Sequence, residues 1–78
     1  MNIKVKVYNK IKYLPESEKV AEIEYSNIKK MEIKTLEDKE IFAMGFDMVD
    51  EYKEYCFITF ANGETATFRN SYVDVFKV

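Results

Sequence analysis

The sequence predicts a mainly β fold, either a small antiparallel meander or an SH3-like barrel of five to seven strands, formed as a single domain by residues 1–78. Three observations predict it. Apolar and polar residues alternate along most of the chain, which is the periodicity of half-buried strands. Asn62-Gly63 lies between two alternating runs and is a strong signal of a β-hairpin. Only two Gly and one Pro occur, so long irregular loops are not expected.

The first two strands are predicted on either side of a turn. Apolar residues alternate with polar ones over residues 2–13, which predicts a half-buried strand. Pro15 lacks a backbone donor and marks a turn over residues 14–18. The alternation resumes over residues 19–25, and only registers that pair even-numbered with even-numbered residues keep both apolar rows on one face.

The third strand is predicted to contain an irregularity. Met31, Ile33 and Thr35 alternate with charged residues, but Ile28 is out of phase with them. One extra residue restores the phase in a β-bulge. We therefore expect a bend or bulge near Lys29.

Residues 36–53 fit two structures. A charged turn followed by residues 40–46, which are apolar on both faces, predicts a buried central strand. Apolar residues also recur at helical spacing through this segment, and Thr35 with Asp38 has the spacing of a capping box. Gly45 would weaken a helix that continued through it. The strand is the favoured prediction, and an α+β fold with one helix at about 36–53 is the alternative.

The hairpin is expected to turn at Asn62-Gly63 in a two-residue type I′ turn, in which both residues have positive φ. That turn places Phe57 opposite Phe68 and leaves apolar side chains on both faces of the hairpin. A last strand is predicted over residues 72–78.

The residues available for chemistry argue against an enzyme. The chain contains no His, the commonest general base and transition-metal ligand. Cys56, the single cysteine, lies within the predicted hairpin and is interpreted as a structural thiol. No calcium-loop spacing, glycine-rich phosphate loop or Cys-x-x-Cys motif occurs. We expect no catalytic residue, no metal and no cofactor.

The cellular location is predicted from cysteine usage and hydropathy. One cysteine fits a reducing compartment. Charged residues interrupt the apolar pattern near the start, and no run approaches the roughly 18 apolar residues of a membrane span. The cytoplasm is the expected location.

Charge is distributed unevenly along the chain. Residues 1–34 carry eight Lys against five Glu, and residues 35–78 carry four basic against nine acidic groups. The net charge of -2 argues against a generic nucleic-acid binder. Alternating residues of the first strand form a lysine stripe: Lys4, Lys6, Tyr8, Lys10 and Lys12. This stripe is interpreted either as a weak nucleic-acid-binding site or as a solvated face.

An acidic and aromatic segment before the hairpin is the candidate protein-binding surface, with a solvated acidic loop as the alternative interpretation. Its residues are Asp47, Met48, Asp50, Glu51, Tyr52, Glu54 and Tyr55. Aromatic side chains dominate interface energetics, and carboxylates complement a basic partner. The expected partner is a protein. A partner with a basic nucleic-acid-binding surface would complement these carboxylates.

The composition, rich in Lys, Ile, Asn, Tyr, Glu and Phe, and the closing run ITFANGETATFRNSYVDVFKV resemble the small accessory proteins of phages and mobile elements in AT-rich bacteria. That group includes anti-CRISPR and other anti-defence inhibitors. The resemblance, one of size and character, implies a stoichiometric inhibitor of a bacterial nucleic-acid-handling or defence complex, acting in the host cytoplasm. A self-associating structural protein, and hence a homo-oligomer, is a further alternative.

Overall fold

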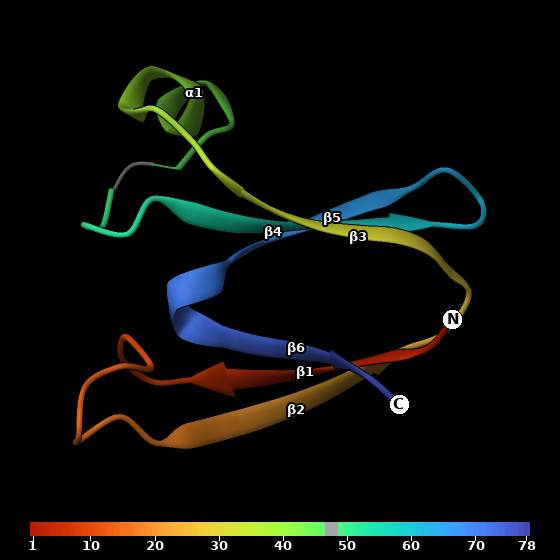
Figure 1. Ribbon diagram of the computed structural model, residues 1–78, viewed down its shortest axis with the longest axis horizontal. Helices are drawn as coiled ribbons and strands as arrows, with labels where there is room; N and C mark the ends of the chain where they lie inside the picture. The colour runs from red at the N-terminus through yellow and green to blue at the C-terminus, as the bar shows by residue number, and fades with distance from the viewer. Residues whose placement is uncertain (47–48) are drawn as a thin grey trace.

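Two three-stranded antiparallel sheets face each other in the computed structural model, which describes residues 1–46 and 49–78 (Figure 1). The strand orders are β2-β1-β6 and β3-β4-β5. The elements are β1 (Ile3–Tyr8), β2 (Lys19–Tyr25), β3 (Ile28–Thr35), α1 (Asp38–Ala43), β4 (Glu54–Phe60), β5 (Thr65–Arg69), the 3-10 helix η1 (Asn70–Tyr72) and β6 (Val73–Lys77). The mainly β prediction is confirmed, but the strand ladders of the described residues do not close into a barrel.

The first sheet has the predicted register. Lys4 lies opposite Glu24 and Lys6 opposite Glu22, so even-numbered residues pair with even-numbered ones. The apolar rows of β1 and β2 therefore share the face that points toward the second sheet, and Ile3 is fully buried there.

β1 ends at Tyr8, so the predicted extension of this strand to residue 13 is wrong. The N–H of Asn9 donates to the carbonyl of Glu18 at 3.0 Å, and the N–H of Glu18 donates to Asn9 Oδ1 at 2.9 Å. A local side-chain bond of this kind competes with the strand ladder. The chain therefore leaves the sheet at Asn9 and returns at Glu18, with residues 10–17 as the β1–β2 loop.

The second sheet contains the predicted bulge. The register of β3 against β4 shifts between Ile28 and Lys30, which places the extra residue at Lys29. The chain enters this strand through Asn27, whose φ of 58° is in the left-handed region that Asn tolerates better than most residues. This tight corner carries the chain from one sheet to the other.

The predicted central strand at 40–46 is wrong, because the chain forms the short helix α1 outside the second sheet (Figure 1). The capping box uses Glu37 and Glu40, not Thr35 and Asp38. Gly45 has a φ of 95°, and its N–H donates to the carbonyl of Phe42 at 3.0 Å. Gly45 is thus the left-handed residue that ends a short helix. The helical alternative had the right type of element but extended it to residue 53.

The hairpin forms where it was predicted, with a different turn. Gly63 has a φ of 90°, but Asn62 does not have positive φ. The N–H of Gly63 donates to the carbonyl of Phe60, and the N–H of Glu64 donates to Asn62 Oδ1, both at 3.0 Å. The loop therefore has three residues, with Gly63 as the left-handed residue that follows the turn.

This longer loop shifts the predicted register by one residue. Phe57 lies opposite Thr67, and Phe68 lies opposite Cys56. Since one residue of shift moves a side chain to the other face of a sheet, Phe68 joins Cys56 and Ile58 on the inner face. The predicted Phe57–Phe68 pair is therefore wrong.

The core lies between the two sheets. Its buried members come from both: Ile3, Val5, Ile28, Cys56, Ile58 and Val73. Burial raises the pKa of the Cys56 thiol and so disfavours the reactive thiolate, as expected of a structural cysteine. No helix in residues 1–46 or 49–78 has the length and apolar character needed to cross a membrane.

An aromatic group covers one end of the outer face of the second sheet. Tyr55 is only 1% exposed, and its ring centroid lies 5.1 Å from that of Phe46, just after α1. The guanidinium of Arg69 lies over the rings of Phe46 and Tyr72, at 5.9 and 5.6 Å. The outer face of β4 is therefore covered at its Tyr55 end, whereas Phe57, further along the same face, is half-buried.

Candidate protein-binding surface

Asp50 connects the segment after α1 to η1. Its Oδ1 accepts hydrogen bonds from the N–H groups of Tyr52 and Lys53, at 2.9 and 3.0 Å. Its Oδ2 accepts one from the hydroxyl of Ser71 at 2.6 Å, and Ser71 is fully buried. The same carboxylate thus holds the turn that positions Tyr52 and fastens it to a distant part of the chain.

The ionised form of Asp50 is the one that the fold stabilises. Burial would raise the pKa of this carboxyl, but the hydrogen bonds from Ser71, Lys53 and Tyr52 outweigh burial. The charge of Arg69 acts in the same direction, and the pKa falls below its ordinary value of 3.8.

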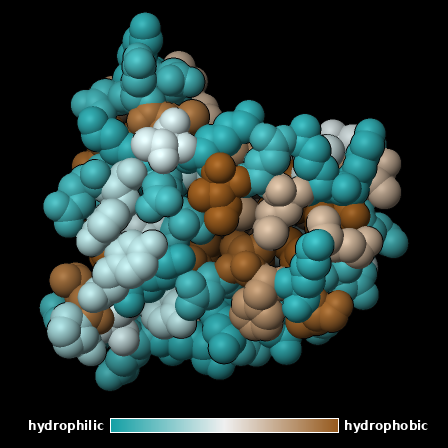
Figure 2. Space-filling model, in the orientation of Figure 1, coloured by the Kyte–Doolittle hydropathy of each residue, from teal (hydrophilic) through white to brown (hydrophobic). Residues whose placement is uncertain are grey.

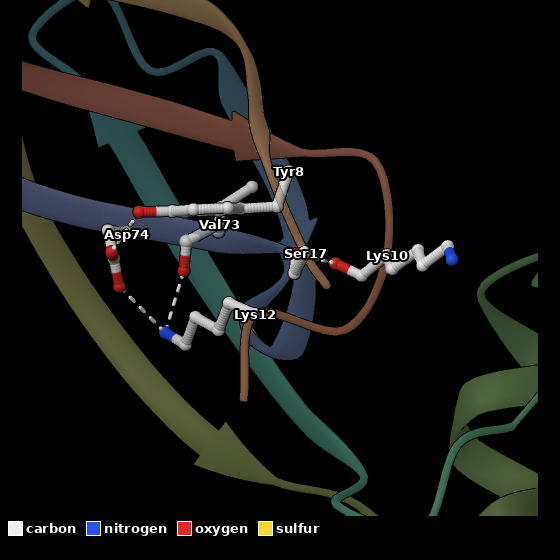
Figure 3. A network of polar contacts seen from close by, with 6 residues as sticks. All are labelled: Tyr8, Lys10, Lys12, Ser17, Val73 and Asp74. Atoms are coloured by element: carbon white, nitrogen blue, oxygen red, sulfur yellow. Dashed lines mark hydrogen bonds and ion pairs between the residues drawn. The ribbon is translucent and has the colours of Figure 1, made fainter. Parts of the chain in front are cut away.

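Lys12 fastens the β1–β2 loop to the neighbouring segment (Figure 3). Its Nζ donates to the carbonyl of Val73 at 2.7 Å and pairs with Asp74 Oδ1 at 3.1 Å. Its N–H donates to the carbonyl of Ser71 at 2.8 Å. Tyr8 completes the group, because its hydroxyl donates to Asp74 Oδ2 at 2.9 Å. Both loops are therefore anchored on residues 71–74.

The two anchored loops meet through a pair of tyrosines. The ring centroids of Tyr13 and Tyr52 are 4.8 Å apart, with an interplanar angle of 53°. Tyr13 is 52% exposed, and its neighbour Leu14 is also exposed. Burial and the adjacent carboxylate of Glu51 raise the pKa of Tyr52, which is therefore neutral at physiological pH. We call Tyr13, Leu14, Glu51 and Tyr52 the tyrosine surface.

The structure divides the residues of the predicted acidic segment between different roles. Asp47 and Met48 lie outside the described residues. Tyr55 is buried beneath the aromatic group, and Asp50 is engaged in the hydrogen bonds between η1 and the turn. Glu51 is exposed, whereas Tyr52 and Glu54 are half-buried.

Tyr13, Leu14 and Ser71 were not among the predicted site residues. Tyr13 and Leu14 lie about 40 residues before Tyr52, and nothing in their sequence pattern relates them to it. The one local signal of a contact surface is Leu14 beside Pro15, and it is weak. An apolar residue in a turn is poorly placed to pack into the core. The contact between the loops depends on how the two sheets face each other.

The part of the chain that carries Glu51 and Tyr52 is acidic. Residues 36–54 carry seven acidic and two basic side chains, a net charge of -5. Lys53 Nζ pairs with Asp38 Oδ1 at 2.8 Å and so joins the turn to the helix. α1 and residues 50–53 lie at the same end of the molecule, opposite the hairpin tip (Figure 1).

The lysine stripe does not form one continuous basic surface. The Lys12 side chain is only 13% exposed and is paired with Asp74. Lys4 and Lys6 lie opposite Glu24 and Glu22 on β2, which partly neutralise them. These pairings favour the structural interpretation of the lysines over a nucleic-acid site.

Comparison of the chain with protein-family models, curated proteins and solved structures found no match. Within the described residues, no three His, Cys, Asp or Glu side chains are grouped as metal ligands, and no pocket is present.

Acid should destabilise the protein through Asp50 and Asp74. Hydrogen bonds from Tyr8 and Lys12 outweigh burial and lower the pKa of Asp74, as Ser71 and the turn do for Asp50. A lowered pKa in the folded state stabilises the fold above the unfolded pKa of about 4, and this contribution is lost as the pH falls through the folded pKa. The measurement is urea unfolding between pH 7 and about 2. An Asp50→Asn, Asp74→Asn variant with the same pH dependence as the wild type would contradict this assignment.

Proposed function

We propose that this protein is a non-enzymatic module that binds another protein through the tyrosine surface and the acidic groups beside it. One observation carries the proposal. Asp50 accepts a hydrogen bond from Ser71, and Lys12 donates one to the Ser71 carbonyl, so two distant loops are anchored on the same short segment. This anchoring holds Tyr13 against Tyr52 at the surface. An anchored loop loses little conformational entropy on binding, which favours affinity.

The residue types of the tyrosine surface are suited to protein contact. Tyrosine combines a large apolar ring with a polar hydroxyl and has few rotatable bonds, so it is enriched where proteins bind each other. Leu14 adds exposed apolar area to the pair. The absence of a pocket among the described residues favours a broad partner surface over a small ligand.

The charge at this end of the molecule suits a basic partner. The net charge of -5 over residues 36–54 complements a surface that binds nucleic acid, and such complementarity speeds association. Together with the resemblance to phage and mobile-element accessory proteins, this supports a stoichiometric inhibitor of a bacterial nucleic-acid-handling or defence complex. The predicted place of action is the host cytoplasm.

Affinity capture from a bacterial lysate, quantified by mass spectrometry, tests this proposal. We compare the wild type with Tyr13→Ala and Glu51→Lys, and use Glu64→Lys, exposed at the hairpin tip, as the matched charge control. The wild type and Glu64→Lys should retain the same protein, and each surface variant should bind it at least about tenfold more weakly. Binding should also weaken as the salt concentration rises.

Circular dichroism of each variant separates a loss of binding from a loss of folding. If folded Tyr13→Ala and Glu51→Lys capture every partner as well as the wild type does, the tyrosine surface is not the contact. If the wild type captures no protein, the proposed function is wrong.

A further inference from the structure

Beyond Ile28, whose N–H and carbonyl oxygen are bonded to Met1, the strand β3 has one free edge. Its partner in the sheet is β4, and no second ladder forms on its other side within the described residues. Its eight residues make it longer than the other described strands. The backbone groups along a free edge are available to pair with another strand.

Ile33 is an apolar residue exposed at this edge. It lies opposite Cys56, in the row that faces the core, and yet it is 53% exposed because its outer side has no neighbouring strand. Met31 precedes it in the same row and is half-buried. On the face of the molecule that points toward the viewer, hydrophobic surface, coloured brown and tan, runs down the middle between β3 and β2 (Figure 2).

The opposite face of β3 carries alternating charges. Glu32 pairs with Lys30 at 2.6 Å and with Lys34 at 3.4 Å, and both lysines are exposed. Exposed ion pairs of this kind contribute little to stability. Glu32 and Lys34 therefore lose little if they exchange these partners for groups on another strand.

We propose that a second copy of this chain pairs with β3 in antiparallel orientation, with the two-fold axis at Ile33. In this register Ile33 lies opposite Ile33 of the second copy. Glu32 of each copy lies opposite Lys34 of the other, and Met31 of each lies opposite Thr35 of the other. The two sheets then form a continuous six-stranded sheet.

The sequence of β3 is what selects a second copy as the occupant. Residues 31–35 complement themselves about Ile33, in charge and in apolar character, as a two-fold symmetric interface requires. The register joins residues of equal parity, so the core-facing rows of both copies stay on one face. An axis at Met31 would instead place Ile33 opposite Lys29, at the bulge, and is disfavoured.

Charge reversal with rescue tests this pairing. Sedimentation equilibrium over a range of concentrations should show a monomer–dimer equilibrium for the wild type. Glu32→Lys and Lys34→Glu alone each place like charges opposite one another twice, and each should weaken the dimer at least about tenfold. The double variant Glu32→Lys, Lys34→Glu restores opposite charges across the axis and should restore the dimer. Glu64→Lys, away from β3, should leave it unchanged.

A cysteine at the axis provides a second measurement. Because Ile33 lies opposite the free thiol of Cys56, the test uses a Cys56→Ala background. There Ile33→Cys should form an intermolecular disulfide under mild oxidation, whereas Val20→Cys, exposed on β2, should not. A wild type that stays monomeric at millimolar concentration would overturn the proposal. Rescue of Glu32→Lys by Lys30→Glu but not by Lys34→Glu would overturn the register. Neither result depends on the protein-binding function proposed above.

Discussion

Tyr55→Ala is expected to destabilise the protein by about 3–5 kcal/mol, the usual cost of removing a large buried aromatic side chain. Tyr55 is 1% exposed and packs against Phe46 at the outer face of β4. A chain of 78 residues has a total stability of only about 4–12 kcal/mol, so much of this variant should be unfolded. Urea unfolding followed by circular dichroism measures the change.

Tyr55→Phe is the matched control for this prediction. The Tyr55 hydroxyl is buried and has no hydrogen-bond partner among the described residues. Removing an unpaired buried hydroxyl relieves its desolvation cost, so Tyr55→Phe should leave stability unchanged or increase it by up to about 1 kcal/mol. A destabilisation of Tyr55→Phe as large as that of Tyr55→Ala would show that the hydroxyl has a structural role.

Asp50→Ala is expected to cost about 1–3 kcal/mol and to release the turn at Tyr52. The variant removes three hydrogen bonds and leaves the fully buried Ser71 hydroxyl without its acceptor. The cost is moderated because Asp50 is itself half-buried and water replaces part of what is lost. Hydrogen exchange at the amides of Tyr52 and Lys53 should accelerate more than exchange in β1.

Two further variants isolate the contact between Asp50 and Ser71. Asp50→Asn keeps an oxygen that accepts from the turn amides and should cost less than Asp50→Ala. In a double-mutant cycle, Asp50→Ala and Ser71→Ala should be less than additive, with a coupling of about 1–2 kcal/mol. Strict additivity would mean that the 2.6 Å contact contributes nothing to stability.

These variants also separate positioning residues from contact residues. Asp50 positions Tyr52, and Tyr55 supports the sheet, so both are expected to affect binding through the fold. Glu51 and Tyr13 are exposed and are expected to affect binding with the fold intact. The sequence placed Asp50, Glu51 and Tyr55 in one group because it shows residue type without showing burial.

For most strands, the local sequence pattern was sufficient to predict which side chains share a face of the sheet. The alternation in β1 and β2 predicted that even-numbered residues pair with even-numbered ones, and the phase change after Ile28 predicted the bulge near Lys29. Both follow from the two-residue period of a strand, which fixes the face of each side chain relative to its neighbours. The mainly β composition of the fold followed from the same period.

Local pattern failed where two structures share the same short-range signals. Residues 38–43 satisfy both a strand and a helix, and the capping box at Glu37 with the left-handed Gly45 decided for the helix. At Asn62-Gly63, a bond from the Glu64 amide to the Asn62 side chain accompanied a three-residue loop, and the register moved by one. A few hydrogen bonds of about 1 kcal/mol each are enough to select between such alternatives.

The sequence by itself determined the class of fold, the inward rows of β1 and β2, and the acidic character of residues 36–54. Only the tertiary structure decided which of the acidic and aromatic residues are exposed and that Tyr13 meets Tyr52. The physical reason is the distance along the sequence over which each feature is determined. Strand periodicity is a property of neighbouring residues, whereas the tyrosine surface exists because Lys12 and Asp50, 38 residues apart, are both held by residues 71–74.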